Sequence, residues 1–149
     1  MLLMKNSEKI LSRYRKWVML LALVGISLAS YLYYEYAVQE TFGVCDINSV
    51  LNCDPVTKGK LAELWGIPVS LIGLAGYLTI LVTAGLRKFK WAFGVAIFGM
   101  LFCLRLMFLE IFVEGIICLV CVACQLVMLV ELFLTYQLAF PEKVGLRML

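Results

Sequence analysis

The sequence predicts an all-α membrane protein, a single domain over residues 1–149 that forms a bundle of four transmembrane helices with a cysteine-bearing extracytoplasmic loop between the first two. The first observation is composition: 64% of the 149 residues are hydrophobic, against roughly 45–50% in soluble domains. The second is that four apolar runs each reach the roughly 17–25 residues that a helix needs to cross a bilayer. The third is a long polar stretch between the first two runs, which contains two of the six cysteines.

Aromatic residues bound the four predicted spans. Three spans open at a tryptophan and two end at tyrosines, as is typical of residues that anchor helices at the membrane interface. The expected limits are about 17–36, 65–86, 91–113 and 116–136, and the loop covers about 38–64. The first run is too long for a signal peptide and has no small-residue cleavage pattern, so we expect an uncleaved span.

Lysine and arginine are distributed unevenly between the two sides of the membrane. If the spans alternate in direction, ten fall on the side of the N-terminus and only Lys58 and Lys60 on the other, while Arg105 lies within a span. Cytoplasmic segments carry the excess of these residues in membrane proteins. We therefore expect a multi-pass protein of the inner or plasma membrane, with both termini in the cytoplasm and the loop on the extracytoplasmic face.

Four cysteines form two pairs whose spacing indicates redox chemistry. Cys118 and Cys121 open the fourth run, and at a helix N-terminus the unpaired N–H groups and the macrodipole favour the nucleophilic thiolate. Cys45 and Cys53 lie in the loop with seven residues between them, in a compartment where disulfides persist. The predicted topology brings both pairs to the outer membrane face, so we expect the four to form one catalytic site.

Other reactive side chains lie within the spans. Arg105 and Glu110 are about 140° apart around a helix, so we expect no direct ion pair between them. Charged residues in a span are costly, and Arg105 is a candidate for lining the active cavity. Glu110 and Glu114 share one face near the outer end, where we expect them to reach into the headgroups. Cys103 and Cys124 lack a paired spacing, and we expect them to pack within the bundle.

Several motifs occur together along the chain. They are Ser30-Tyr31-Leu32-Tyr33-Tyr34, Cys45-x7-Cys53-Asp54-x-Val56, Gly66-Ile67-Pro68 followed by Leu71-Ile72-Gly73-Leu74, and Glu110-Ile111-Phe112-Val113 leading to Cys118-x-x-Cys121. This combination, over residues 20 to about 130, resembles the vitamin K epoxide reductase family, in particular prokaryotic-type members without a fused thioredoxin-like domain. The resemblance implies a four-helix bundle around a quinone at the outer leaflet. It also implies Cys118 and Cys121 as the quinone-reactive centre and Cys45 and Cys53 as the electron shuttle.

Two positions depart from the family pattern. Thr57 follows the second loop cysteine where many members have serine, and Gln125 stands where animal members have tyrosine. The Gln125 amide could donate a hydrogen bond to a quinone carbonyl. The candidate residues for binding ubiquinone or menaquinone are therefore Cys121, Gln125 and Arg105.

The predicted enzyme is a quinone-dependent, disulfide-forming oxidoreductase. A separate thioredoxin-fold protein would reduce Cys45 and Cys53, which would pass the electrons to the helical pair by thiol–disulfide exchange. The chain has no histidine and no flavin or nicotinamide motif, so a quinone dissolved in the lipid is the acceptor that fits. By position, Cys53 should bridge transiently to Cys118, leaving the deeper Cys121 to meet the quinone.

Three alternatives remain open at this point. A vitamin K epoxide reductase would have the same cysteine layout, and a non-enzymatic tetraspan protein would use the cysteines structurally. A zinc site could use four thiolates, but the seven-residue spacing in the loop is unlike that of zinc knuckles, and an oxidising compartment disfavours it. We therefore expect no metal and no nucleic acid, and as partners only the redox protein and membrane lipid.

Overall fold

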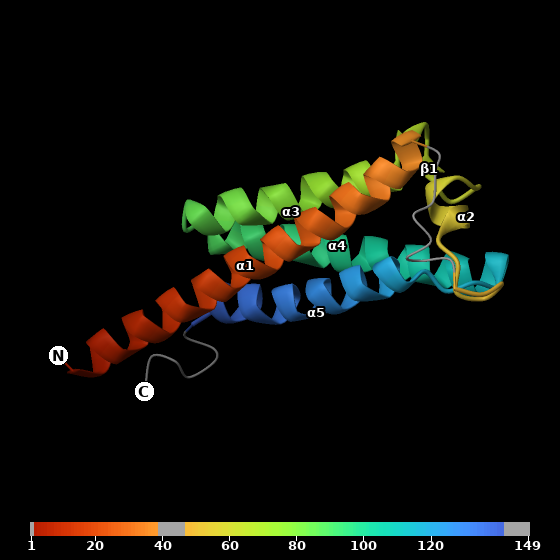
Figure 1. Cartoon of the computed structure of the whole chain (residues 1–149). Coiled ribbons are helices and arrows are strands. Elements are labelled where there is room, and N and C mark those ends of the chain that lie inside the picture. The colour runs from red at the N-terminus through yellow and green to blue at the C-terminus, as the bar shows by residue number, and fades with distance from the viewer. Residues whose placement is uncertain (1, 39–46, 142–149) are drawn as a thin grey trace.

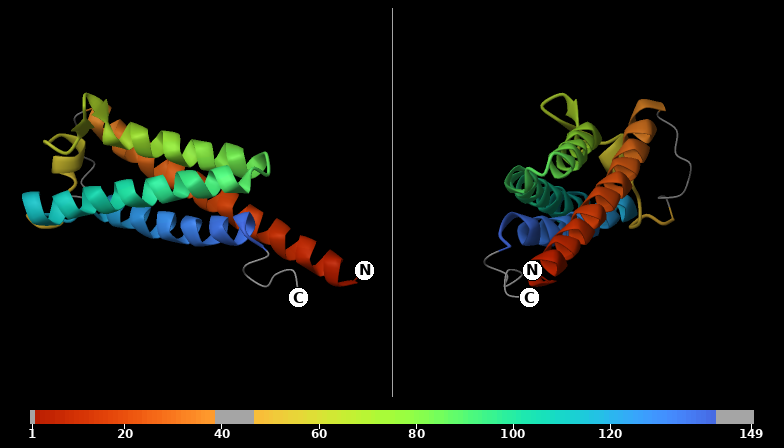
Figure 2. Two further views of the ribbon diagram at one scale, coloured as in Figure 1. Left: turned by 180° about the vertical axis from the view of Figure 1, so that it is seen from behind. Right: turned by 90° about the vertical axis from the view of Figure 1, so that its left-hand side faces the viewer.

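The structure is a computed structural model, which describes residues 2–38 and 47–141, with side chains from residue 8 onwards. Its long helices are α1 (Leu2–Val38), α3 (Val69–Gly85), α4 (Phe89–Leu109) and α5 (Leu119–Ala139). A π-helical turn, η1 (Glu110–Glu114), continues α4. α1 packs against α3 and α5, and α4 packs against the same two helices, so the long helices lie lengthwise together (Figures 1 and 2).

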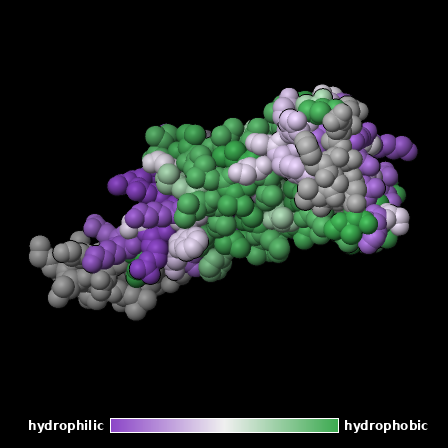
Figure 3. All heavy atoms as spheres, in the orientation of Figure 1, coloured by the Kyte–Doolittle hydropathy of each residue, from purple (hydrophilic) through white to green (hydrophobic). Residues whose placement is uncertain are grey.

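Within the described residues, three helical segments are long and apolar enough to cross a membrane, Glu8–Val38, Phe89–Glu114 and Leu119–Ala139. Apolar surface covers the middle of the molecule, and hydrophilic residues gather toward its two ends (Figure 3). The chain is therefore a mostly helical, multi-pass membrane protein, which confirms the predicted class. α3 has 17 residues and is shorter than the other three helices. That all four helices cross the membrane therefore stays a prediction.

The first helix begins earlier than the predicted span. α1 starts at Leu2, well before residue 17, because lysine and arginine are good helix formers and the helix continues through the basic segment. The turn between α3 and α4 is short, as the predicted span limits of 65–86 and 91–113 require, and Arg87 has the left-handed conformation at φ 58°. The start of α1, this turn and the end of α5 lie at one end of the molecule, with β1 (Glu63–Leu64) and α2 (Asp54–Thr57) at the other (Figure 1).

The second span starts later than the sequence predicts, because a small hairpin precedes it. β1 (Glu63–Leu64) pairs antiparallel with β2 (Ile67–Pro68). The two residues of the turn, Trp65 and Gly66, have φ values of 54° and 82°, as a two-residue hairpin loop requires. Pro68 is consequently the N-cap of α3 and does not lie in its first turn.

The core of the bundle allows close contact between α1 and α3. Small buried residues such as Ala22 and Ala84 accompany one large aromatic side chain, Tyr77, which is 2% exposed. Gly25 makes room for this ring, because a Cβ atom there would lie 2.3 Å from Tyr77 Cε1. Tyr77 thus stands between α1 and α5, and its hydroxyl donates a hydrogen bond to the Cys124 carbonyl at 3.0 Å.

Candidate active site

The Cys-x-x-Cys pair lies at the start of α5, as predicted. Cys118 is the N-cap of the helix, and its Sγ accepts a hydrogen bond from the Cys121 N–H at 3.4 Å. The helix begins three residues later than the predicted limit of 116 because Ile117 is extended and hydrogen-bonded to the loop. Its N–H donates to the Val50 carbonyl at 2.7 Å, and its carbonyl accepts from the Asn52 N–H at 3.2 Å.

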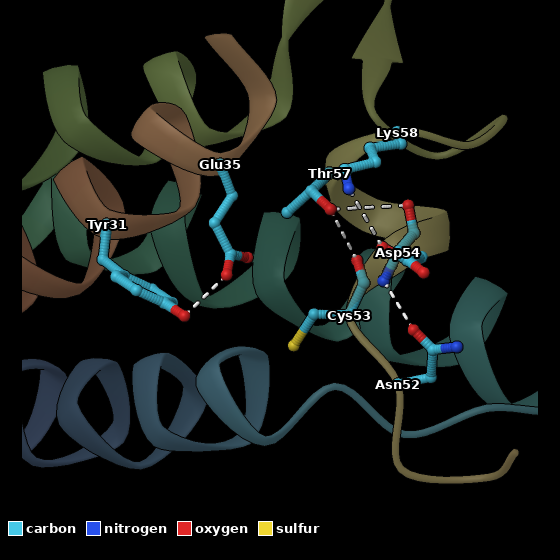
Figure 4. A network of polar contacts seen from close by, with 7 residues as sticks. All are labelled: Tyr31, Glu35, Asn52, Cys53, Asp54, Thr57 and Lys58. Carbon is cyan, nitrogen blue, oxygen red and sulfur yellow. Dashed lines mark hydrogen bonds and ion pairs between the residues drawn. The ribbon is translucent and has the colours of Figure 1, made fainter. Parts of the chain in front are cut away.

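This short parallel bridge between Leu51 and Ile117 brings the second loop cysteine to the helical pair. Cys53 is the N-cap of α2 (Asp54–Thr57), and the Thr57 hydroxyl donates to its carbonyl at 3.1 Å (Figure 4). Cys53 and Cys118 are 1% and 0% exposed. Their Sγ atoms lie 2.7 Å apart.

Three of the four predicted catalytic cysteines therefore meet in the structure. Cys53 is disulfide-bonded, and its predicted partner Cys45 lies outside the described residues. Cys121 carries a free thiol. Two segments that are 65 residues apart in the chain thus place their sulfur atoms in contact, an arrangement that thiol–disulfide exchange requires.

Glu110 also belongs to this site, contrary to the expectation from the sequence. The expectation that it reaches into the headgroups is wrong, because its residue is 1% exposed and its Oε2 accepts a hydrogen bond from the Cys118 N–H at 3.3 Å. A carboxylate oxygen of Glu110 and the Sγ atoms of Cys118 and Cys121 all lie within 4.8 Å of one another. The only sequence signal for this contact is that Glu110 lies eight residues before Cys118. That signal is weak, because a regular helix through residues 110–118 would not bring Cys118 back to the Glu110 side chain.

Within the described part of the chain, these three residues form the only group of acidic and thiol side chains close enough to hold a metal ion. Both sulfur atoms of this group also belong to the predicted redox pair. A metal ion held there would occupy the thiolates that disulfide exchange needs, so the two uses of the site exclude each other.

A mostly apolar cavity between the helices adjoins the cysteines. Side chains of α1, α3 and α4 line it, together with Val56 of α2 and, from α5, Cys121 and Cys124. Cys103 also lines it, so the two cysteines expected only to pack contact this space. Ser70 and Tyr77 supply its hydroxyl groups. Apolar walls with a few polar groups are the composition typical of sites that bind small organic molecules.

The other predicted quinone ligands lie elsewhere. Gln125 is buried, but its Nε2 donates to Met100 Sδ at 3.2 Å, and it does not line the cavity. Arg105 is exposed on α4 and is also absent from the lining. Of the three predicted quinone-binding residues, the structure therefore brings only Cys121 to the cavity.

Reactive sulfur atoms from two segments beside an apolar cavity, in a multi-pass membrane protein, are typical of a membrane oxidoreductase. Residues 16–136 match the sequence model of the vitamin K epoxide reductase family. The chain belongs to this family, which consists of membrane oxidoreductases that use quinones. No curated protein matches the chain significantly.

Proposed function

We propose that the protein is a quinone-dependent thiol–disulfide oxidoreductase that supports disulfide formation in extracytoplasmic proteins. The observation that carries this proposal is the 2.7 Å contact between Cys53 Sγ and Cys118 Sγ, with Cys121 on the wall of the adjoining cavity. The contact supports electron transfer from the loop to the helix, and the cavity supports transfer from the helix to a lipid-soluble acceptor.

The electron path consists of two exchange reactions. A dithiol of a separate thioredoxin-fold protein reduces the Cys45–Cys53 disulfide and becomes a disulfide itself. The Cys53 thiolate then attacks Cys118 in the Cys118–Cys121 disulfide, which releases Cys121 as a thiolate. Cys45 resolves the Cys53–Cys118 bond and restores the loop disulfide. Each exchange moves two electrons, and the helical pair ends as a dithiol.

Cys121 is the better candidate for delivering these electrons. It lines the cavity, whereas Cys118 is fully buried against Cys53. A bound ubiquinone or menaquinone supplies an acceptor for two electrons and two protons. The chain contributes the apolar walls that exclude water and a hydroxyl on Ser70 for orientation. Oxidation of the dithiol restores the Cys118–Cys121 disulfide.

We further propose that all four long helices cross the membrane, with both termini in the cytoplasm. α3 measures about 26 Å at 1.5 Å per residue over its 17 residues, slightly less than the hydrocarbon thickness of about 30 Å. The hairpin before α3 covers the missing length of about 4 Å at the outer interface, where Trp65 is 95% exposed. The basic residues at the opposite end support a cytoplasmic location for that end.

Quinone reduction by purified protein tests the proposed function. With a reduced thioredoxin-fold protein as donor and ubiquinone-1 or menadione as acceptor, we expect one quinol for each disulfide formed. Ser49→Ala is a matched control for the replacement of a loop cysteine by alanine, because Ser49 is exposed in the loop that contains Cys53 and is close to cysteine in size. Thiol oxidation without quinol formation would overturn the proposal. Vitamin K epoxide, offered with dithiothreitol, tests the epoxide reductase alternative in the same preparation.

A further inference from the structure

Glu110 has a buried carboxyl group beside the reacting sulfur atoms, and the electron path proposed above assigns it no role. Its Oε2 accepts the Cys118 N–H at 3.3 Å, but its Oε1 is buried without a hydrogen-bond partner among the described residues. A buried polar atom left unsatisfied costs free energy and calls for an explanation. The unpartnered oxygen belongs to the group that approaches both Cys118 Sγ and Cys121 Sγ within 4.8 Å.

The backbone around Glu110 closes on this side chain. η1 is a π-helical turn, a feature that is frequent at functional sites. The Glu110 carbonyl accepts from the N–H of Gly115 and, at 3.0 Å, from that of Ile116. Gly115 has a φ of 66°, a left-handed conformation that glycine adopts without strain. The chain therefore turns back, so that the segment leading to Cys118 passes the carboxyl group.

We propose that Glu110 is the proton-transfer residue of the Cys118–Cys121 pair, an inference that rests on the proposed function. When the dithiol is oxidised, its two electrons and the Cys118 proton go to the quinone, which takes its second proton from water, and the Glu110 carboxylate holds the proton of the Cys121 thiol. When the Cys53 thiolate later attacks Cys118, the Cys118–Cys121 bond breaks and the Cys53–Cys118 bond forms. Cys121 leaves with the electron pair and receives the proton back from Glu110.

Few other titratable groups face this carboxyl group. The thiols of Cys118 and Cys121 come from the start of α5, and Cys103 is the neighbouring thiol on α4. α2 also packs on η1, but its acid, Asp54, pairs with Lys58 at 3.6 Å. Among the described residues, Glu110 is thus the acid whose carboxylate lies within reach of both sulfur atoms.

Glu110→Gln separates proton transfer from mere positioning. The glutamine oxygen can still accept the Cys118 N–H, but the amide cannot carry a proton. Glu110→Asp keeps the acid on a shorter stem. Glu114→Gln is the matched control, because Glu114 lies on the same π-helical turn and outside the group of three.

The first measurement needs neither quinone nor a partner protein. Alkylation of Cys121 by iodoacetamide in the reduced protein is followed by peptide mass spectrometry between pH 5 and 10. Interacting acids titrate in separate macroscopic steps, and the interaction between Cys118 and Cys121 is common to every variant. We therefore expect a second inflection, due to the carboxyl group, in the wild type, in Glu114→Gln and in Glu110→Asp, but not in Glu110→Gln. A profile in Glu110→Gln identical to the wild type would overturn the proposal.

The second measurement is the rate at which dithiothreitol reduces the helical disulfide. General acid–base catalysis contributes about 10²–10⁴-fold, so we expect Glu110→Gln to be slower by about 100-fold at pH 7, with Glu110→Asp recovering part of the loss. A rate within twofold of wild type would show that Glu110 only positions Cys118. If Glu110→Gln does not fold, Glu110→Asp decides, since loss of its second inflection would contradict the proposal. Failure of quinone reduction with both results intact would instead contradict the proposed function.

Discussion

Gly25→Ala should destabilise the bundle and distort the cavity through a single neighbour, Tyr77. The new Cβ atom would lie 2.3, 2.4 and 2.5 Å from three ring atoms of Tyr77. An ordinary carbon contact is about 3.5 Å, so the ring must retreat by about 1.2 Å, the difference between 3.5 and 2.3 Å. Tyr77 is 2% exposed and lines the cavity beside the cysteines, so this movement changes both the packing of the core and the shape of the cavity wall.

The expected cost combines three effects. Overpacking a core costs about 1–3 kcal/mol. The hydrogen bond from the Tyr77 hydroxyl to the Cys124 carbonyl, 3.0 Å long, would break and cost about 0.5–1.5 kcal/mol. Replacing a helical glycine by alanine stabilises the helix by about 1 kcal/mol, which offsets part of this cost. The net loss of unfolding free energy is therefore about 0.5–3.5 kcal/mol.

SDS titration of the purified protein, followed by circular dichroism, measures this loss. Gly76→Ala is the matched control, since a Cβ there meets no atom within 4 Å, and it should not lose stability. Gly25→Ala combined with Tyr77→Leu should recover stability relative to the sum of the single changes, because leucine leaves room for the methyl group. Because Tyr77 lines the cavity, Gly25→Ala should also raise the KM for quinone. Equal unfolding of Gly25→Ala and Gly76→Ala would refute the reasoning.

Three further predictions concern the site and its side of the membrane. Cys53→Ala should abolish oxidation of the thioredoxin-fold partner while quinone reduction by dithiothreitol persists, and a loss of both activities would mean that the two centres do not act in sequence. Cys121→Ala should accumulate a Cys53–Cys118 disulfide in non-reducing peptide maps, whereas a map without it would contradict the attack order. In intact cells an impermeant maleimide should label Ser49→Cys but not Lys88→Cys, both of which are exposed positions, and the reverse pattern would overturn the proposed topology.

The sequence predicted well what depends on composition and on short-range spacing. Membrane class follows from apolar runs, which need no knowledge of packing. The position of Cys118 at a helix start follows from a spacing of three residues, and the structure confirms it within one turn. The turn at Arg87 follows from a short polar interruption between two apolar runs. Each of these predictions uses information that lies within one segment of the chain.

What the sequence did not predict depends on backbone conformations that interrupt regular helices. The hairpin before α3 requires Trp65 in the left-handed region, which is uncommon for a non-glycine residue. The burial of Glu110 requires the π-helical turn and the reversal at Gly115. A helical wheel places Glu110 and Glu114 on one face, and a π-turn changes that geometry. The quinone-binding assignments of Gln125 and Arg105 likewise rested on position in sequence, whereas membership of the cavity wall depends on how the helices are rotated.

The register of the loop against the segment before α5 determines whether electrons can reach the helical pair. Only Asn52 separates Cys53 from Leu51, which pairs with Ile117, and Cys118 directly follows that partner. A strand advances by about 3.3 Å per residue, so a slip of one residue in this bridge would shift Cys53 by more than its present 2.7 Å separation from Cys118. The bridge uses backbone groups of Val50, Asn52 and Ile117, so side-chain substitutions there leave its hydrogen bonds intact. An insertion between Leu51 and Cys53 would not, and it would separate the two sulfur atoms while all four cysteines remained in the chain.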